Sequence, residues 1–150
     1  AGSGVTHSEF NDSASERLHF LQIWIQPQVM GIAPGYEQKR IRQSGSLTPL
    51  VTPDGREGSL MMHQDASLSR LILDQAVPAE RFATVDRMGY LHVVRGGGRA
   101  AGRQLGPGDA LAFNPGRQFD VMAGAEGLEA LWFDLPPMKR ERIGGHRPTG

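Results

Sequence analysis

Residues 90–113 read YLHVVRGGGRAAGRQLGPGDALAF, and this stretch decides the fold class. Two short apolar runs, YLHVV (90–94) and ALAF (110–113), enclose a segment rich in glycine. Short apolar runs separated by glycine, proline, asparagine or aspartate are typical of strands joined by turns. We therefore predict a hairpin turn over the run of Gly96, Gly97 and Gly98 followed by Gly102, and a second tight turn at Gly106–Gly108.

Runs of the same kind occur on both sides of this stretch, namely LHFLQIWI (18–25), RLILD (70–74), RFATVD (81–86) and ALWFDL (130–135). No window of helical length carries a sustained apolar stripe, and 20 glycines and 10 prolines would interrupt most helices. The pattern predicts an all-β sandwich or barrel with little helix. The Gly-rich break TPDGREGS (52–59) is suited to separate two consecutive β units.

Composition excludes several classes of protein. The chain of 150 residues has 16 basic and 16 acidic side chains, so it lacks the basic excess expected of a protein that binds nucleic acid directly. It has no cysteine, which excludes disulfides, thiolate metal sites and cysteine nucleophiles. No apolar run is long enough to indicate a membrane span or a signal peptide, so we expect a cytoplasmic protein without membrane contact.

His7 and Glu9 form the first candidate site. Residues two apart on a strand project to the same face, so a strand here would place both side chains together, with Ser8 pointing away. An imidazole nitrogen and a carboxylate oxygen suit a divalent transition metal. The alternative is that His7 is an ordinary histidine at a strand end with Glu9 solvated beside it.

Other histidines are weaker candidates. His19 would share the inward face of its strand with Leu21 and Ile23 and could approach the same site, although a histidine in such a row is more often a hydrogen-bonded core residue. His63 is interpreted as a strand-end or interface group. His92 is interpreted as a packed or hydrogen-bonded side chain.

Longer phrases carry a resemblance to a known family. The phrases GSGVTHSEFNDS, LHFLQIWIQP and GIAPGYEQKRI resemble the central signature of the pirin family, and the similarity continues through PDGREGSLMMHQDASLSRLIL to LWFDLPP, over residues 1 to 137. Pirins are two-domain cupins with jelly-roll barrels. The resemblance implies closing strands of a first, partial barrel with a linker (1–57), a complete C-terminal barrel (58–137) and a flexible tail (138–150).

The resemblance also implies a metal site. Pirins hold one non-haem metal in the first barrel through three histidines and a glutamate, and the His-x-Glu of this motif corresponds to His7 and Glu9. The other two ligands belong to an upstream His-x-His phrase, which we expect on a segment absent from this chain. Iron(II) is the first choice of metal, with nickel, copper, manganese and cobalt as alternatives, and this chain alone is expected to hold it weakly or not at all.

The C-terminal barrel is expected to bind no metal. No His-x-His precedes YLHVV, and Gln118 stands near the place where a cupin usually offers its late histidine; a neutral amide is a poor ligand for a transition ion.

Two functions follow from the resemblance. The first is a dioxygenase of the quercetin 2,3-dioxygenase type in the intact protein, which acts on a flavonol, with Glu9 as catalytic proton acceptor and with this chain inactive alone. The alternative is a non-enzymatic, metal-dependent binding protein or co-regulator. Unpaired strand edges around VTHSEF and LHFLQIWI would favour a homo-oligomer.

Overall fold

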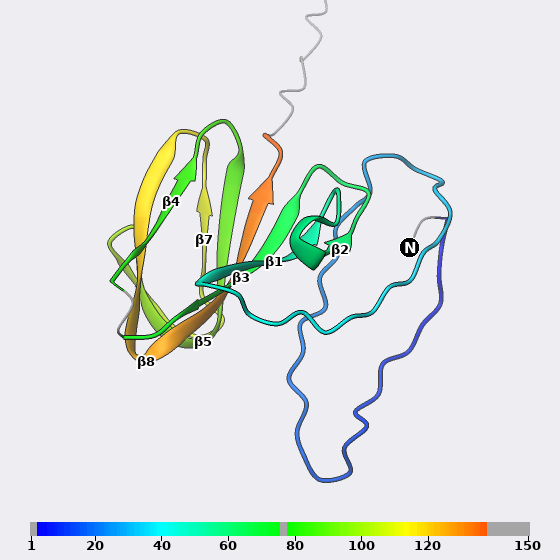
Figure 1. Ribbon diagram of the computed structural model, residues 1–150, viewed down its shortest axis with the longest axis horizontal. Helices are drawn as coiled ribbons and strands as arrows, with labels where there is room; N and C mark the ends of the chain where they lie inside the picture. Colours follow the sequence, from blue (N-terminus) through cyan, green and yellow to red (C-terminus); the bar gives the residue numbers. More distant parts are fainter. Residues whose placement is uncertain (1–2, 76–77, 138–150) are drawn as a thin grey trace, which may run out of the picture.

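The computed structural model describes residues 3–75 and 78–137, and it contains strands and one short 3-10 turn in this part of the chain. In Figure 1 the strands curl around one side of the molecule, and residues 3–46 form a long excursion beside them. The elements are β1 (Leu47–Thr52), η1 (Arg56–Gly58), β2 (Leu60–Met61), β3 (Ser67–Leu73), β4 (Glu80–Thr84), β5 (Met88–Ala100), β6 (Arg103–Leu105), β7 (Ala110–Phe113) and β8 (Arg117–Leu135). The all-β prediction is confirmed.

The strands form one curled, open sheet in the order β2-β1-β3-β8-β5-β6, with β4 added on β8 and β7 added on β5. All pairs are antiparallel except β1 with β2. Strand β8 is 19 residues long and pairs with three others: β4 along its first part, β3 along its last part and β5 from Val121 to Leu135. Strand β5 also pairs with three strands, β6, β7 and β8, so β5 and β8 form the centre of the sheet.

Aromatic side chains fill the space enclosed by the sheet. The period of two along β5 places Leu91 and Val93 inside, both fully buried. The rings of Phe113 and Phe119 stack with their centroids 3.8 Å apart, and Trp132 lies 4.8 Å from the ring of Phe82. These four rings belong to the same core cluster as Leu91 and Val93.

The hairpin turn predicted over the glycine run forms only at its end, near Gly102, and the prediction is wrong for Gly96–Gly98. The three glycines lie inside β5, and the turn comes later, at Ala101 and Gly102, whose φ angles of 48° and 78° are those of a tight hairpin turn. The glycines are needed because other backbones approach them closely: a Cβ on Gly98 would overlap the carbonyl oxygen of Met122, and one on Gly97 would lie 2.8 Å from that of Leu105. At Gly106–Gly108 the chain does turn between β6 and β7, as predicted.

The strands expected around His7 and over residues 18–25 are not formed. No residue between 3 and 46 belongs to a strand, and this region is called the arm below. A strand needs hydrogen bonds from a neighbouring strand. Within the described ranges, no backbone hydrogen bond of this kind reaches residues 3–25.

The domain boundary expected at residue 58 stays a prediction. Strand β1 lies before this boundary and pairs with β3, so the sheet already begins at Leu47. The tail expected over residues 138–150 lies outside the described residues.

Polar contacts attach the arm to the sheet and its loops, among them one in which Nζ of Lys39 donates to the carbonyl oxygen of Ser59 at 3.0 Å. Near the end of the arm, Arg70 on β3 donates from Nε to Oε1 of Gln43 at 2.7 Å. Further back, the backbone N–H of Gln28 donates to the carbonyl oxygen of His63 at 2.9 Å, and Nε2 of Gln64 donates to the carbonyl oxygen of Gln26 at 2.7 Å. The part of the arm that carries His7 is therefore far along the chain from its attachments.

Candidate functional site

The structure brings His7 and Glu9 together. Nε2 of His7 lies 3.6 Å from Oε1 of Glu9, and the two side chains are 50% and 47% exposed. The two side chains therefore turn to the same side of the arm, as expected of residues two apart on extended chain. They present a nitrogen and an oxygen donor to solvent.

These two donors are an incomplete metal site. Among the residues that the structure describes, no group of three or more histidine, aspartate or glutamate side chains is placed to hold a metal ion. The types of donor suit a divalent transition metal, because imidazole and carboxylate are both common ligands of such ions. The number of donors is too small, because stable metal sites in proteins use at least three protein donors.

The structure separates the other predicted residues from this pair. His19 is exposed on the arm, and the side chain of His63 is exposed beyond the end of β2. His92 is half-buried on the face of β5 opposite to Leu91 and Val93, so it does not reach the interior. Gln118 is exposed on β8, next to the buried Phe119.

A hollow of about 510 Å³ borders Glu9. One wall is a turn in which Nδ2 of Asn11 donates to the carbonyl oxygen of Glu16 at 2.7 Å, and Oγ of Ser13 accepts from the N–H of Glu16 at 2.9 Å. Phe10 and Phe20 also line it, and both are largely exposed. Glu9 thus lies at the edge of an open hollow lined by both polar and apolar residues.

A second, larger groove was not predicted from the sequence. It has a volume of about 630 Å³ and lies between the arm and the outer face of β1, β2 and β3. Its walls are mostly apolar, with Ile23 and Ile25 from the arm facing Val51, Met61 and Leu68 from the strands. No local motif marks such a groove, because its two walls come from separate segments of the chain.

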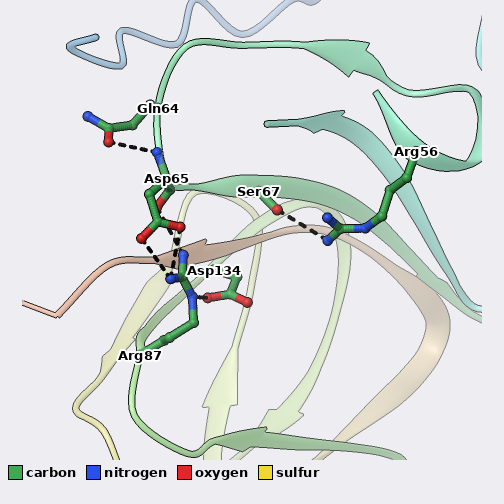
Figure 2. Close-up of polar contacts among 6 residues, drawn as sticks. All are labelled: Arg56, Gln64, Asp65, Ser67, Arg87 and Asp134. Atoms are coloured by element: carbon green, nitrogen blue, oxygen red, sulfur yellow. Dashed lines mark hydrogen bonds and ion pairs between the residues drawn. The ribbon is translucent and has the colours of Figure 1, made fainter. Parts of the chain in front are cut away.

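Arg87, in the turn between β4 and β5, forms a clamp that joins strand β8 to the loop between β2 and β3 (Figure 2). Its Nε donates to Oδ1 of Asp134 at 2.5 Å, and its Nη1 donates to both carboxylate oxygens of Asp65 at 3.0 and 3.1 Å. Nη2 also donates to the carbonyl oxygen of Asp65 at 2.9 Å. Partial burial disfavours the charged guanidinium and lowers the pKa of Arg87. The hydrogen bonds to Asp65 and Asp134 favour the charged form and raise the pKa by more, so it lies above its ordinary value. The clamp ties the end of β8 to the loop that carries Gln64.

Replacing Arg87 by Met should lower the free energy of unfolding by about 1 to 2 kcal/mol, because the clamp is only partly buried and water screens it. The loss leaves two carboxylates near each other without their common partner. Arg81→Met is the matched control: Arg81 also pairs with one aspartate, Asp120, but is 77% exposed. Urea unfolding followed by circular dichroism measures both, and equal losses would contradict the clamp.

Comparison with solved structures defines the class of protein. The chain is similar to the crystal structure of YhhW from Escherichia coli, with a TM-score of 0.70 and 32% identity over 79% of this chain and 50% of that one. The E. coli bacterial pirin YhhW in complex with nickel(II) gives a TM-score of 0.69 at 34% identity, over 77% and 49% of the two chains. A cupin protein from Bacteroides fragilis shares the fold at 16% identity and a TM-score of 0.52, over 79% and 93%. The sheet is thus a cupin fold.

Sequence comparison narrows this class. The family described as quercetinase C-terminal cupin domain matches residues 49–135. Quercetin 2,3-dioxygenase from E. coli K12 is 38% identical over 138 residues, which are 92% of this chain and 59% of that protein. The chain therefore belongs to the pirin family and carries its C-terminal cupin domain. It spans about three fifths of the length of the curated E. coli relatives that it matches.

Among the described residues, no helix has the length and apolar character required to cross a bilayer. The cytoplasmic location expected from the sequence stays a prediction.

Proposed function

We propose that this chain is the C-terminal part of a metal-dependent dioxygenase of the quercetin 2,3-dioxygenase type, with His7 and Glu9 as two of the metal ligands. The observation that carries the proposal is the position of the two donors, 3.6 Å apart, half exposed and turned to the same side. The name of the E. coli relative and the nickel(II) complex of the E. coli pirin support it. The remaining ligands would come from another segment, and iron(II) remains the first choice of metal.

Each of the two residues has its own role in this proposal. The metal, when bound, would polarise the hydroxyl and ketone oxygens of a flavonol. His7 would hold the ion with an imidazole nitrogen, and Glu9 would hold it with a carboxylate oxygen. The same carboxylate borders the open hollow and would accept the proton of the flavonol hydroxyl.

The filled interior of the C-terminal cupin sheet supports a site on the arm. Trp132 and three phenylalanines occupy the place where a cupin with a metal in its barrel needs a cavity and histidines. In the described part of the sheet, no histidine points into this interior. The sheet then serves as a rigid support, and its contacts with Gln26, Gln28 and Gln43 hold the arm.

The test replaces the matched region of the E. coli quercetin 2,3-dioxygenase by this chain, so that the rest of that protein supplies the remaining segments. Glu9→Gln should lower quercetin turnover by about a hundredfold, because positioned acid–base groups contribute at least that much. His7→Ala should lower metal content, since an imidazole donor is lost outright. His63→Ala, at an exposed histidine beyond the end of β2, is the control. Turnover is followed by the loss of flavonol absorbance, and metal content by mass spectrometry.

Unchanged turnover in both Glu9→Gln and His7→Ala, with the metal still bound, would contradict the proposal. It would mean that the pair is a solvated His–Glu contact. The alternative, a metal-dependent binding protein or co-regulator, would be supported if His7→Ala removed the metal from a protein that never turned over quercetin.

A further inference from the structure

A continuous row of hydrogen bonds leads from strand β8 to the arm. Arg87 donates to Asp134 near the end of β8 and, on its other side, to Asp65 in the loop of residues 62–66 between β2 and β3 (Figure 2). The backbone N–H of Asp65 donates to Oε1 of Gln64 at 2.8 Å, and Nε2 of Gln64 donates to the carbonyl oxygen of Gln26 on the arm at 2.7 Å. This row, from Asp134 to Gln26, is called the Arg87 relay below.

Arg87 holds Asp65 by its side chain and by its backbone at once. Nη1 of Arg87 lies 3.0 and 3.1 Å from the two carboxylate oxygens, and Nη2 lies 2.9 Å from the carbonyl oxygen. Because the guanidinium is planar and its donors have fixed directions, these contacts together fix the orientation of the whole residue. The side chain of Asp65 is 55% exposed, so packing alone does not fix it, whereas that of Arg87 is only 29% exposed.

The same loop attaches the arm at a second point. The carbonyl oxygen of His63, next to Gln64, accepts the backbone N–H of Gln28 at 2.9 Å. The two contacts join neighbouring residues of the loop to nearby residues of the arm, so a loop that changed its shape would lose both. The attachment of the arm therefore depends on the residue that fixes the shape of the loop, which is Arg87.

The attached part of the arm leads to the hollow beside Glu9. Residues 18–26 continue without a turn or bend, and Leu18 and Phe20 line the hollow together with Glu9. A displacement of the arm at Gln26 is thus carried along one uninterrupted stretch to the wall of the hollow.

We propose that Arg87 is a positioning residue for the candidate metal site. Through the relay it holds the arm at Gln26, and this part of the arm leads to the wall of the hollow beside Glu9. Arg87 itself contacts neither metal nor substrate. The effect on the reaction rests on the proposed function, while the effect on the arm is a property of this chain by itself.

Two conservative variants interrupt the relay at different steps. Arg87→Lys keeps the positive charge but replaces the planar fork of donors by a compact ammonium on a flexible stem, so it should release the orientation of Asp65. Gln64→Glu is nearly isosteric and breaks the next step, because a carboxylate accepts from the N–H of Asp65 but cannot donate to the carbonyl oxygen of Gln26.

The first experiment measures amide hydrogen exchange by NMR in this chain. Each variant should speed exchange of the N–H of Gln28 by about five- to tenfold, the factor that corresponds to one net hydrogen bond. The N–H of Val93 in β5 is the internal reference and should exchange at an unchanged rate. Arg56→Lys is the matched control, because Arg56 also donates from a loop to a strand, and its partners are Asp54 and Ser67.

A double variant tests whether the two changes act along one path. If Arg87 and Gln64 belong to one relay, Arg87→Lys combined with Gln64→Glu should speed exchange at Gln28 no more than the stronger single variant does. Factors that multiply would show two separate contacts.

The second experiment uses the substituted E. coli protein that carries this chain. Arg87→Lys and Gln64→Glu should lower quercetin turnover per bound metal ion by about three- to tenfold, because a small misplacement of a reacting group is costly. A merely structural role would lower metal content and turnover in proportion and leave their ratio unchanged. Arg56→Lys should change neither quantity.

Three results would overturn the inference: unchanged exchange at Gln28 in both relay variants, multiplying factors in the double variant, or faster exchange with an unchanged ratio of turnover to metal. A substituted E. coli protein that binds metal but never turns over quercetin would reject the proposed function instead. Exchange at Gln28 then decides whether Arg87 positions the arm.

Discussion

Replacing Trp132 by Ala is expected to lower the free energy of unfolding of this chain by about 3 to 5 kcal/mol, the usual cost of removing a buried tryptophan. Trp132 is only 8% exposed, and its ring lies within 4.8 to 6.1 Å of the rings of Phe82, Phe119 and Phe113. The ring also occupies the space next to Gly89, where a Cβ would overlap it. Alanine would therefore leave a cavity at the centre of the aromatic cluster, bounded by a backbone that cannot easily close it.

The chain supplies its own control for this measurement, because it has two tryptophans. Trp24 on the arm is 80% exposed, so Trp24→Ala should change the free energy of unfolding by no more than about 0.5 kcal/mol. Urea unfolding by circular dichroism compares both variants with the unchanged chain. A cost below about 1.5 kcal/mol for Trp132→Ala would show that the interior is loosely packed, which the ring distances contradict.

Replacing Gly98 by Ala is expected to cost about 3 kcal/mol, at the upper end of what overpacking a core usually costs. The added methyl group would overlap the carbonyl oxygen of Met122. Gly98 is paired on one side with Leu105 and on the other with Ala123, so it cannot move away from β8 without losing contact with β6. The obstacle is backbone, which cannot rotate aside as a side chain can.

Gly106→Ala is the matched control, since a Cβ there meets only Oδ2 of Asp109, at 3.9 Å. The same urea experiment applies, and the Gly98 variant should unfold at a clearly lower denaturant concentration than the Gly106 variant. Equal midpoints would mean that β5 and β8 are not as close as described, and that the glycine run is a loop after all.

The strands of the sheet could largely be predicted from short apolar runs. RLILD, RFATVD, YLHVV, ALAF and ALWFDL all overlap strands of the structure. LHFLQIWI has the same pattern but forms no strand, because within the described ranges no neighbouring strand pairs with it. The pattern shows which side chains would share a face, but it does not show whether a partner strand is present. The full length of β8 could not be predicted either, because Gly124 and Gly127 suggest a turn in the sequence. Both glycines lie within the strand, and Gly127 has a positive φ of 74°.

Only one part of the candidate site could be predicted from the sequence, namely the two neighbouring side chains of His7 and Glu9. The spacing of His7 and Glu9 was enough to expect neighbouring side chains, and the structure places them together, while their role as ligands stays a prediction. The Arg87 clamp could not be predicted, because it joins residues 22 and 47 positions away in sequence. Such contacts depend on the pairing of the strands, which no short window of sequence records.

The position of β8 in the chain has a consequence for synthesis on the ribosome. Strands β3, β4 and β5 all pair with β8, which is synthesised last. The final residue of β8, Leu135, is made 88 residues after the first residue of the sheet, Leu47. At ~5 to 20 residues per second, the edges of β3, β4 and β5 that pair with β8 stay open for several seconds, although β3 can already pair with β1. Their apolar faces are then open to chaperones and to other nascent chains, so the yield of folded protein in a cell should depend more on this interval than on the stability of the finished sheet.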